Sequence, residues 1–204
     1  MYGLTFLTVF VYALDAKTIL VRCFVMKKMI NPFDRVSDIL TALPNGGVLL
    51  TSRAHGRVNT MTIGWGTLGI DWSTPVFIAY VREGRFTREL IDASGVFTVN
   101  VPVGEFNRRI LGYAGTKSGR DVDKIAELGL TLEEPEVVSC PGIKEFPLTL
   151  ECRVVCRQKQ DISALAELPR NKYYPQDVPS TNPGSNRDAH IAYYGEIVCA
   201  YVIE

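Results

Sequence analysis

The chain has 204 residues, which is enough for one domain with a hydrophobic core and gives no reason to expect a second. Its 22 acidic and 22 basic residues balance. The sequence therefore lacks the excess positive charge with which nucleic-acid-binding proteins release counterions. Any anion site must come from a local cluster of charge.

Residues 1–28 are predicted to lie outside the main domain. They contain the apolar run LTFLTVFVYAL, which is too short to cross a membrane and lacks the features of a signal peptide. This segment is either an extra hairpin that turns at residues 15–17 or sequence translated upstream of a true start at Met26 or Met29. We favour the second interpretation, place the domain at residues 29–204 and expect no membrane partner.

The cysteines predict a reducing environment. There are five, without a C-x-x-C pair, and an odd, scattered set without a secretion signal is typical of the cytoplasm. Cys152 and Cys156 lie four residues apart in a strand-like run, so both are expected in the core on one face. No cluster has zinc-ligand spacing, and no metal is expected.

The segment NPFDRVSDILTAL predicts the first helix. Asn31 can cap it, and Pro32 suits its first turn. Apolar residues recur at helical spacing along the segment. These residues are Val36, Ile39, Leu40 and Leu43.

From Gly46 onward strands dominate the pattern. GGVLLTSR and RVNTMTIGWG predict a hairpin with an exposed His55 in its turn. Further strands are expected in TPVFIAYVR, GVFTVNVP, PLTLECRVVCRQKQ and HIAYYGEIVCAYVIE, and short helices in EFNRRILGYAG, DVDKIAELGL and ISALAEL. Hairpin-length links between many strands favour an antiparallel barrel that is mainly β, with peripheral helices.

The glycines of the third strand region do not indicate a dinucleotide site. Gly64, Gly66 and Gly69 lie in or beside a strand and do not open a helix, so they form no Rossmann fingerprint. We expect them to let a flat group approach the backbone.

The stretch REGRFTRELIDASG predicts a helix with unusual charge at its start. Thr87 is placed to cap it, while Arg82, Arg85 and Arg88 crowd its first turn. The helix dipole puts partial positive charge at this end, so cations are unfavourable there unless an anion binds among them. Arg88 could instead point to solvent or pair with Asp92. The pattern indicates an anion site.

Several separated motifs resemble one known family. The run NTMTIGWGTLGIDWSTPVFIAYVREGRFTRELI, then GVFTVNVP, GTKSGRDVDK and HIAYYGEIVCAYVIE, is similar to the flavin reductase-like, FMN-binding split-barrel family in its flavoredoxin-like branch. The similarity extends over residues 31–204. It implies a Greek-key split β-barrel and a homodimer with FMN at or near the subunit interface. The expected anion is then the phosphate of FMN.

Two groups of residues are predicted to hold the flavin tail. Arginine can grip phosphate oxygens in pairs and a hydroxyl adds a directional donor, which are the roles expected of Arg82, Arg85 and Thr87. The resemblance implies that the loop GTKSGRDVDK also lies near the cofactor. It assigns contacts with the phosphate or ribityl chain to Lys117, Ser118 and Lys124, while Asp121 or Asp123 caps the next helix.

The flavin ring needs a flat, largely apolar place with main-chain donors and acceptors at its rim. The strand NTMTIGW fits this need, although alternating threonine and apolar residues are also ordinary barrel sequence. The residues expected to contact the ring are Thr60, Met61, Thr62, Ile63, Gly64 and Trp65.

The remaining polar residues give no acid–base constellation. His190 begins the last strand and could contact flavin or incoming nicotinamide, or equally hydrogen-bond a backbone carbonyl. Residues 169–190 form a long loop rich in Pro, Asn and Ser, in which Tyr173 or Tyr174 could cover the flavin or simply be exposed. Hydride transfer does not require protein acid–base groups, because the cofactor carries the chemistry.

The predicted function is therefore a flavin-dependent oxidoreductase. NAD(P)H would pass hydride to the flavin N5, and the electrons would reach an undetermined small-molecule or protein acceptor. The alternative is an FMN-holding electron carrier that does not turn over NAD(P)H itself. A pyridoxamine phosphate oxidase is disfavoured because no second arginine-rich cradle is found, and a barrel that only mediates protein contacts would not bind flavin.

Overall fold

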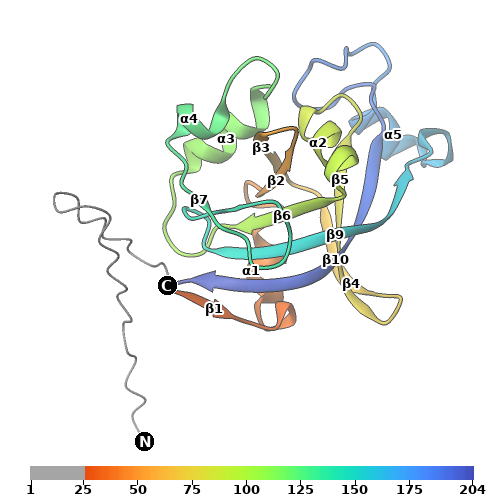
Figure 1. Cartoon of the computed structure of the whole chain (residues 1–204). Helices are drawn as coiled ribbons and strands as arrows, with labels where there is room; N and C mark the ends of the chain where they lie inside the picture. The colour runs from red at the N-terminus through yellow and green to blue at the C-terminus, as the bar shows by residue number, and fades with distance from the viewer. Residues whose placement is uncertain (1–25) are drawn as a thin grey trace, which may run out of the picture.

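A computed structural model describes residues 26–204, so the hairpin considered at residues 15–17 lies outside the described part (Figure 1). The strands are β1 (Lys27–Met29), β2 (Val48–Ala54), β3 (Arg57–Ile63), β4 (Gly66–Asp71), β5 (Thr74–Arg82), β6 (Val96–Val101), β7 (Leu132–Glu133), β8 (Gly142–Ile143), β9 (Leu148–Lys159) and β10 (His190–Ile203). The helices are α1 (Val36–Ala42), α2 (Phe86–Ser94), α3 (Arg108–Thr116), α4 (Lys124–Leu128) and α5 (Glu167–Tyr173), with 3-10 turns η1 (Pro32–Arg35) and η2 (Ile162–Ala164).

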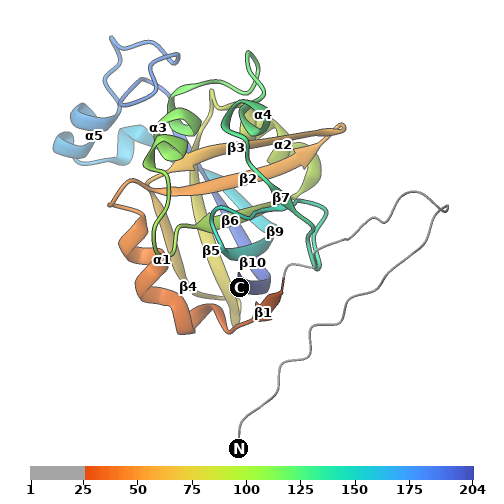
Figure 2. The ribbon, with the colours of Figure 1, turned by 90° about the vertical axis from the view of Figure 1, so that its left-hand side faces the viewer.

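Eight strands form one antiparallel sheet in the order β3-β2-β6-β9-β10-β5-β4, with β1 paired to β10. The two ends of this order, β3 and β4, are consecutive in the chain and are joined by Gly64 and Trp65. The sheet therefore curls into a barrel that no ladder closes between β3 and β4. The helices lie around its outside (Figure 2), which confirms the predicted split barrel that is mainly β with peripheral helices.

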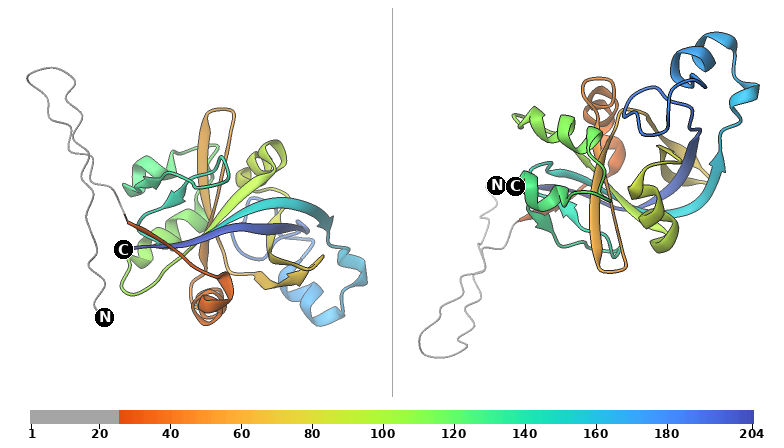
Figure 3. Two further views of the ribbon diagram at one scale, coloured as in Figure 1. Left: turned by 60° about the horizontal axis from the view of Figure 1, so that its bottom comes forward. Right: turned by 90° about the horizontal axis from the view of Figure 1, so that it is seen from above.

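The barrel interior and the helix side of the sheet are both apolar. Val48 and Leu50 of β2 point into the main core, which includes Phe77, while Leu49 between them packs under α3 with Leu111. Because side chains alternate along a strand, this run of apolar residues serves two layers. Figure 3 shows the β2–β3 hairpin running between α3 on one side and α2 on the other.

Local signals for turns and caps are largely confirmed. Asn31 accepts a hydrogen bond from the Phe33 amide at the start of η1. His55 is exposed in the β2–β3 turn, where its φ of 51° precedes Gly56 at 72°. Asp123, rather than Asp121, caps α4 by accepting bonds from two amides of its first turn.

The helix predicted in ISALAEL begins later than expected. Only η2 forms there, and α5 starts at Glu167. Pro169 explains the shift, because proline has no amide donor and is tolerated only in the first turn of a helix.

Two predicted core residues are exposed. Cys152 is fully buried but Cys156 is exposed, because Val155 is an extra residue in β9 opposite the Tyr194–Gly195 step of β10. Such a bulge changes the alternation, so residues four apart no longer share a face. Leu40 is 43% exposed, since only the Ile39 and Leu43 side of α1 packs on the barrel.

The glycines of β4 also differ from expectation. A Cβ at Gly66 would lie 2.5 Å from the ring of Phe77. Gly66 therefore makes room for a core side chain of the protein itself.

The N-terminal strand extends across the predicted domain boundary at residue 29. Lys27 pairs with Ile203 of β10, and its ammonium lies 3.2 Å from Glu133 and 2.8 Å from Glu136. Residues 27 and 28 are thus part of the sheet.

Candidate functional site

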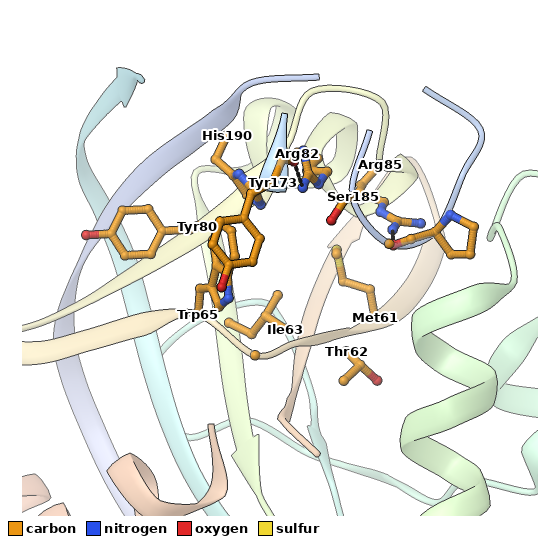
Figure 4. Close-up of a pocket in the computed structure, with 13 residues that line it drawn as sticks. Met61, Thr62, Ile63, Trp65, Tyr80, Arg82, Arg85, Tyr173, Ser185 and His190 are labelled. Atoms are coloured by element: carbon orange, nitrogen blue, oxygen red, sulfur yellow. Dashed lines mark hydrogen bonds between the residues drawn. The ribbon is translucent and has the colours of Figure 1, made fainter. Parts of the chain in front are cut away.

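The first cavity, here called the aromatic cavity, lies where the β3–β4 turn meets the end of β5 and the segment after α5 (Figure 4). Its volume is about 280 Å³. It combines residues of the turn with four aromatic side chains, His190 included, and two arginines. The lining residues are Met61, Thr62, Ile63, Gly64, Trp65, Tyr80, Arg82, Arg85, Tyr173, Pro183, Gly184, Ser185 and His190.

Trp65 is the central aromatic group of this cavity. Its ring centroid lies 5.0 Å from that of Tyr173 in a perpendicular arrangement and 4.7 Å from that of His190 at an angle of 36°. These are favourable geometries for aromatic pairs. The indole is nevertheless 38% exposed, so an apolar surface remains open to a ligand.

His190 is held neutral beside this group. Its Nδ1 lies 2.8 Å from the Tyr174 hydroxyl, which donates its single proton to Gln160 Oε1, also at 2.8 Å. Nδ1 must then donate to the tyrosine oxygen, which leaves Nε2 as an acceptor. Burial, together with the charges of Arg82 and Arg85, lowers the pKa of His190 to about 3.

Arg82 lines the aromatic cavity but directs its hydrogen bonds to protein atoms. Its guanidinium donates to the carbonyls of Tyr173, Asn186 and Asp188 and to the Asn186 side chain. It also lies over the ring of Tyr174, 5.1 Å from its centroid. Arg82 is buried, and desolvation lowers its pKa. This arginine fastens the segment after α5 to the end of β5.

A second cavity, here called the cationic cavity, adjoins the first and shares Met61 and Arg85 with it. Its volume is about 440 Å³. It is formed by the start of α2, the loop between α3 and α4, and β3. Besides Met61 and Arg85, it is lined by Asn59, Gly84, Phe86, Thr87, Ala114, Gly115, Thr116, Lys117, Ser118, Gly119, Arg120, Asp121, Lys124, Ser180 and Thr181, so that Asp121 is its one acidic residue in the described part of the chain.

Arg85 lies at the junction of the two cavities. One of its terminal nitrogens donates to the Pro183 carbonyl. Desolvation lowers its pKa, and Asp188 opposes that shift. Arg88, in contrast, pairs with Asp92 at 2.7 Å and donates to the Glu83 carbonyl. Of the three arginines predicted around an anion, Arg85 is the one whose position suits both cavities.

The start of α2 offers main-chain donors to the cationic cavity. Its N-cap is Arg85, without a side-chain cap, so the expectation that Thr87 caps the helix is wrong. The Thr87 hydroxyl instead accepts a hydrogen bond of 2.7 Å from Asn59 of β3, which fixes it one residue inside the helix. Within residues 26–204, the amides of Phe86 and Thr87 have no hydrogen-bond acceptor.

Lys124 brings a buried positive charge to the same cavity. It is 3% exposed, and its ammonium donates to the carbonyls of Thr60 at 2.9 Å and Ala114 at 2.8 Å. Burial, and secondarily Arg85, lowers its pKa to about 8. No carboxylate lies within ion-pair distance of it in the described part of the chain. A bound anion would supply the missing negative charge.

The other residues predicted in this loop lie closer to solvent. Lys117 is exposed at the end of α3 and Ser118 is half-buried, with its hydroxyl accepting from the Arg120 amide. Both line the cationic cavity, whereas Thr60 contributes its carbonyl to Lys124 instead of lining either cavity. The remaining residues of that set, Met61 to Trp65, line the aromatic cavity, and their contact with a flavin ring stays a prediction.

Several lining residues were not predicted from the sequence. Asn59 and Gly119 meet so closely that a Cβ on Gly119 would lie 2.1 Å from the Asn59 amide oxygen. Arg120 is paired with Glu89 and donates to the Gly84 carbonyl. A polar residue on a buried strand, as Asn59 is, was the available signal for that position. Residues 183–185 belong to the long loop of residues 169–190, which was already considered near the flavin, whereas Tyr80 had no signal of its own.

The paired cavities fit a flavin mononucleotide in their chemistry. The aromatic cavity offers an apolar face and main chain, and the cationic cavity offers amides, a guanidinium and an ammonium without a carboxylate partner. A scan against family models decides the relationship, because the flavin reductase like domain matches residues 40–203. The chain belongs to the flavin reductase-like family. Membership supports a flavin-related oxidoreductase function.

The chain is also similar to individual proteins. An uncharacterized protein of Archaeoglobus fulgidus is 38% identical over 99 residues, which make up 48% of this chain and 55% of that relative. The match thus spans little more than half of the relative. Flavoredoxin of Desulfovibrio vulgaris (Miyazaki F) is 25% identical, with a TM-score of 0.55 over 77% of this chain and 69% of that one.

A more distant solved structure shares the fold. Nitrilotriacetate monooxygenase component B from Bacillus cereus is 19% identical, with a TM-score of 0.56 over 86% of this chain and 81% of that one. No helix in residues 26–204 has the length and apolar character needed to cross a bilayer. The same residues contain no group of three or more metal-ligating side chains.

Proposed function

We propose that this flavin reductase-like chain binds FMN across the two joined cavities and transfers electrons from NAD(P)H to an acceptor. The observation that carries the proposal is the pairing of a ring-sized aromatic cavity with a cationic cavity, joined at Met61 and Arg85. When bound, a flavin supplies the hydride chemistry at its N5.

The residues of the chain would then divide the work of binding. Arg85 and the amides at the start of α2 would hold the phosphate, with Lys124 supplying charge from beneath. Lys117 and Ser118 would contact the phosphate or ribityl chain. Charge-assisted hydrogen bonds of this kind are stronger than neutral ones and orient their anion.

The β3–β4 turn would hold the ring. Residues 61–65 line the aromatic cavity, and Trp65 contributes apolar surface. His190 stays neutral and presents Nε2 as an acceptor, so it would bind an N–H or amide donor of the flavin or of the nicotinamide without adding charge. His190 would therefore orient its ligand, and no step requires it to titrate.

The decisive experiment is the visible absorption spectrum of the purified protein before and after addition of FMN, followed by steady-state oxidation of NADH and NADPH. Bound flavin with NAD(P)H turnover above background supports the oxidoreductase. Bound flavin without such turnover would support an FMN-holding electron carrier. Failure to take up FMN would contradict both.

A homodimer in the cytoplasm completes the proposal. It is supported by the resemblance of the motifs to an FMN-binding family in which the cofactor lies at or near a subunit interface. Light scattering coupled to gel filtration tests the assembly, with and without FMN. A monomer under both conditions would contradict it.

A further inference from the structure

A third cavity lies next to the aromatic cavity and differs from it in chemistry. This apolar cavity has a volume of about 400 Å³ and shares Gly64, Trp65 and Tyr80 with its neighbour. Its other wall comes from the end of α1 and the turn after it. The residues there are Leu40, Leu43 and Pro44, while Gly66 of β4 and Gln160, which follows β9, complete the lining.

Among residues 26–204, no charged side chain lines the apolar cavity. Leu40 is 43% exposed, although the helical pattern predicted it in the core, and Trp65 is 38% exposed. Binding of a ligand is favoured when it removes an apolar side chain at a cavity mouth from water. A charged ligand would lose its hydration here and gain no counter-ion.

Polar groups are limited to the edges of this cavity. Gln160 uses Oε1 to accept from Tyr174, and its NH₂ group has no acceptor in residues 26–204. The Tyr80 hydroxyl likewise makes no hydrogen bond within those residues. Two donors beside an apolar wall suit a flat molecule with carbonyl oxygens at its rim.

We propose that the apolar cavity binds the electron acceptor, and that this acceptor is an uncharged aromatic or quinoid compound. The binding itself depends only on this cavity, whereas the role as acceptor rests on the proposed function. Trp65 and Tyr80 form the wall shared with the aromatic cavity, so the compound would lie beside the flavin. Anionic acceptors such as ferricyanide find no cation there.

The test uses tryptophan fluorescence of the whole chain. The sequence contains two tryptophans, so Trp72→Phe leaves Trp65, at the cavity wall, as the reporter. Titration with 2-methyl-1,4-naphthoquinone should give saturable quenching, corrected with free N-acetyltryptophanamide. The sulfonated naphthoquinone should bind at least tenfold more weakly, because its charge would be desolvated.

A matched pair of leucine variants locates the binding. Leu40→Glu should weaken naphthoquinone binding about tenfold or more. Leu168→Glu places the same change on α5, where the leucine is 79% exposed and lines none of the three cavities, and should leave binding unchanged.

The inference is overturned if Leu40→Glu and the parent protein bind the naphthoquinone with equal affinity, or if the sulfonated compound binds more tightly than the uncharged one. If Leu40→Glu keeps its naphthoquinone affinity but loses a dimer, this face is a subunit interface instead. FMN uptake by the same variants, followed by visible absorption, separates the two proposals. Uptake of FMN without naphthoquinone binding refutes this inference alone. Naphthoquinone binding without FMN uptake refutes the proposed function and retains the cavity.

Discussion

The aromatic and cationic cavities meet at Arg85 but are built from different kinds of group. The aromatic cavity is made by strand ends and by a segment that Arg82 fixes through four hydrogen bonds. The cationic cavity is made by two helix ends and contains a buried ammonium without a carboxylate partner in the described chain. In the aromatic cavity, protein carbonyls accept the hydrogen bonds of the Arg82 guanidinium. In the cationic cavity, the Lys124 ammonium is left to pair with a bound anion.

The comparison teaches that arginines close in sequence can have separate functions. Arg82 is the last residue of β5, and its guanidinium donates its hydrogen bonds to carbonyls of the segment after α5. Arg85 precedes α2 and borders both cavities. A test of the comparison is to remove each in turn.

The largest effect is expected from Arg82→Met, which keeps a flexible apolar stem and removes the guanidinium donors. Several buried carbonyls would lose their partner, and each such loss costs about 1–3 kcal/mol. We expect the free energy of unfolding to fall by about 3 kcal/mol in urea titrations. Arg153→Met is the control, because that arginine is exposed and its nearest carboxylate lies 3.9 Å away. Equal stabilities of the two variants would show that Arg82 is not an anchor.

Arg85→Ala should act on the ligand and not on the fold. Loss of a charge-assisted hydrogen bond costs about 1.5–3 kcal/mol, so FMN should bind roughly ten- to a hundredfold more weakly. Riboflavin, which has no phosphate, should change less than about threefold. Fluorescence titration of both flavins measures the ratio, with Arg153→Ala as control. An equal loss of affinity for FMN and riboflavin would show that Arg85 does not bind the phosphate.

The sequence could predict the elements of this site better than their contacts. Strands and short helices follow from local periodicity, and the run from Met61 to Trp65, which was predicted to contact a flavin ring, lines the aromatic cavity. The partner of Arg82 could not be predicted, because Asn186 and Asp188 approach it only through the path of a long irregular segment. Local signals contain no information about such distant pairs.

Helix capping shows the same limit on a smaller scale. Threonine is a residue type that is common at helix N-caps, yet the Thr87 hydroxyl accepts a hydrogen bond from Asn59 of β3 and Thr87 lies inside α2. Likewise, a single extra residue in β9 exposes Cys156. Tertiary contacts and bulges override local preference in these cases.

Lys124 gives a smaller, pH-dependent contrast. Its pKa of about 8 lies below the ordinary 10.5. As the pH rises, the native chain therefore releases this proton before the unfolded chain does. The cost of burying the charged lysine is largest below pH 8 and is lost above pH 10.5. For binding the sign is opposite, since the charged form below about 8 attracts the phosphate dianion. FMN affinity should fall about three- to tenfold between pH 7 and 9.5, and riboflavin affinity should not.

Lys124→Met is the matched variant for this comparison. It should bind FMN weakly and without the pH dependence, while riboflavin binding reports that the cavity is intact. A wild-type FMN affinity that is constant from pH 7 to 9.5 would exclude a charge contribution from Lys124.

The smallest expected effect concerns His190 in the aromatic cavity. Its pKa is lowered to about 3 from 6.5, so between these values the unfolded chain binds a proton that the native chain does not. The free energy of unfolding must therefore decrease as the pH falls below 6.5. His190→Asn removes this contribution, and its stability should fall by about 0.7 kcal/mol less than that of the wild type between pH 7 and 6. His55→Asn, in an exposed turn where asparagine tolerates the positive φ of 51°, should retain the wild-type slope. If urea titrations at the two pH values give His190→Asn the wild-type slope as well, the imidazole is not held neutral by burial, and the aromatic cavity would then contain a titrating group as the cationic cavity does.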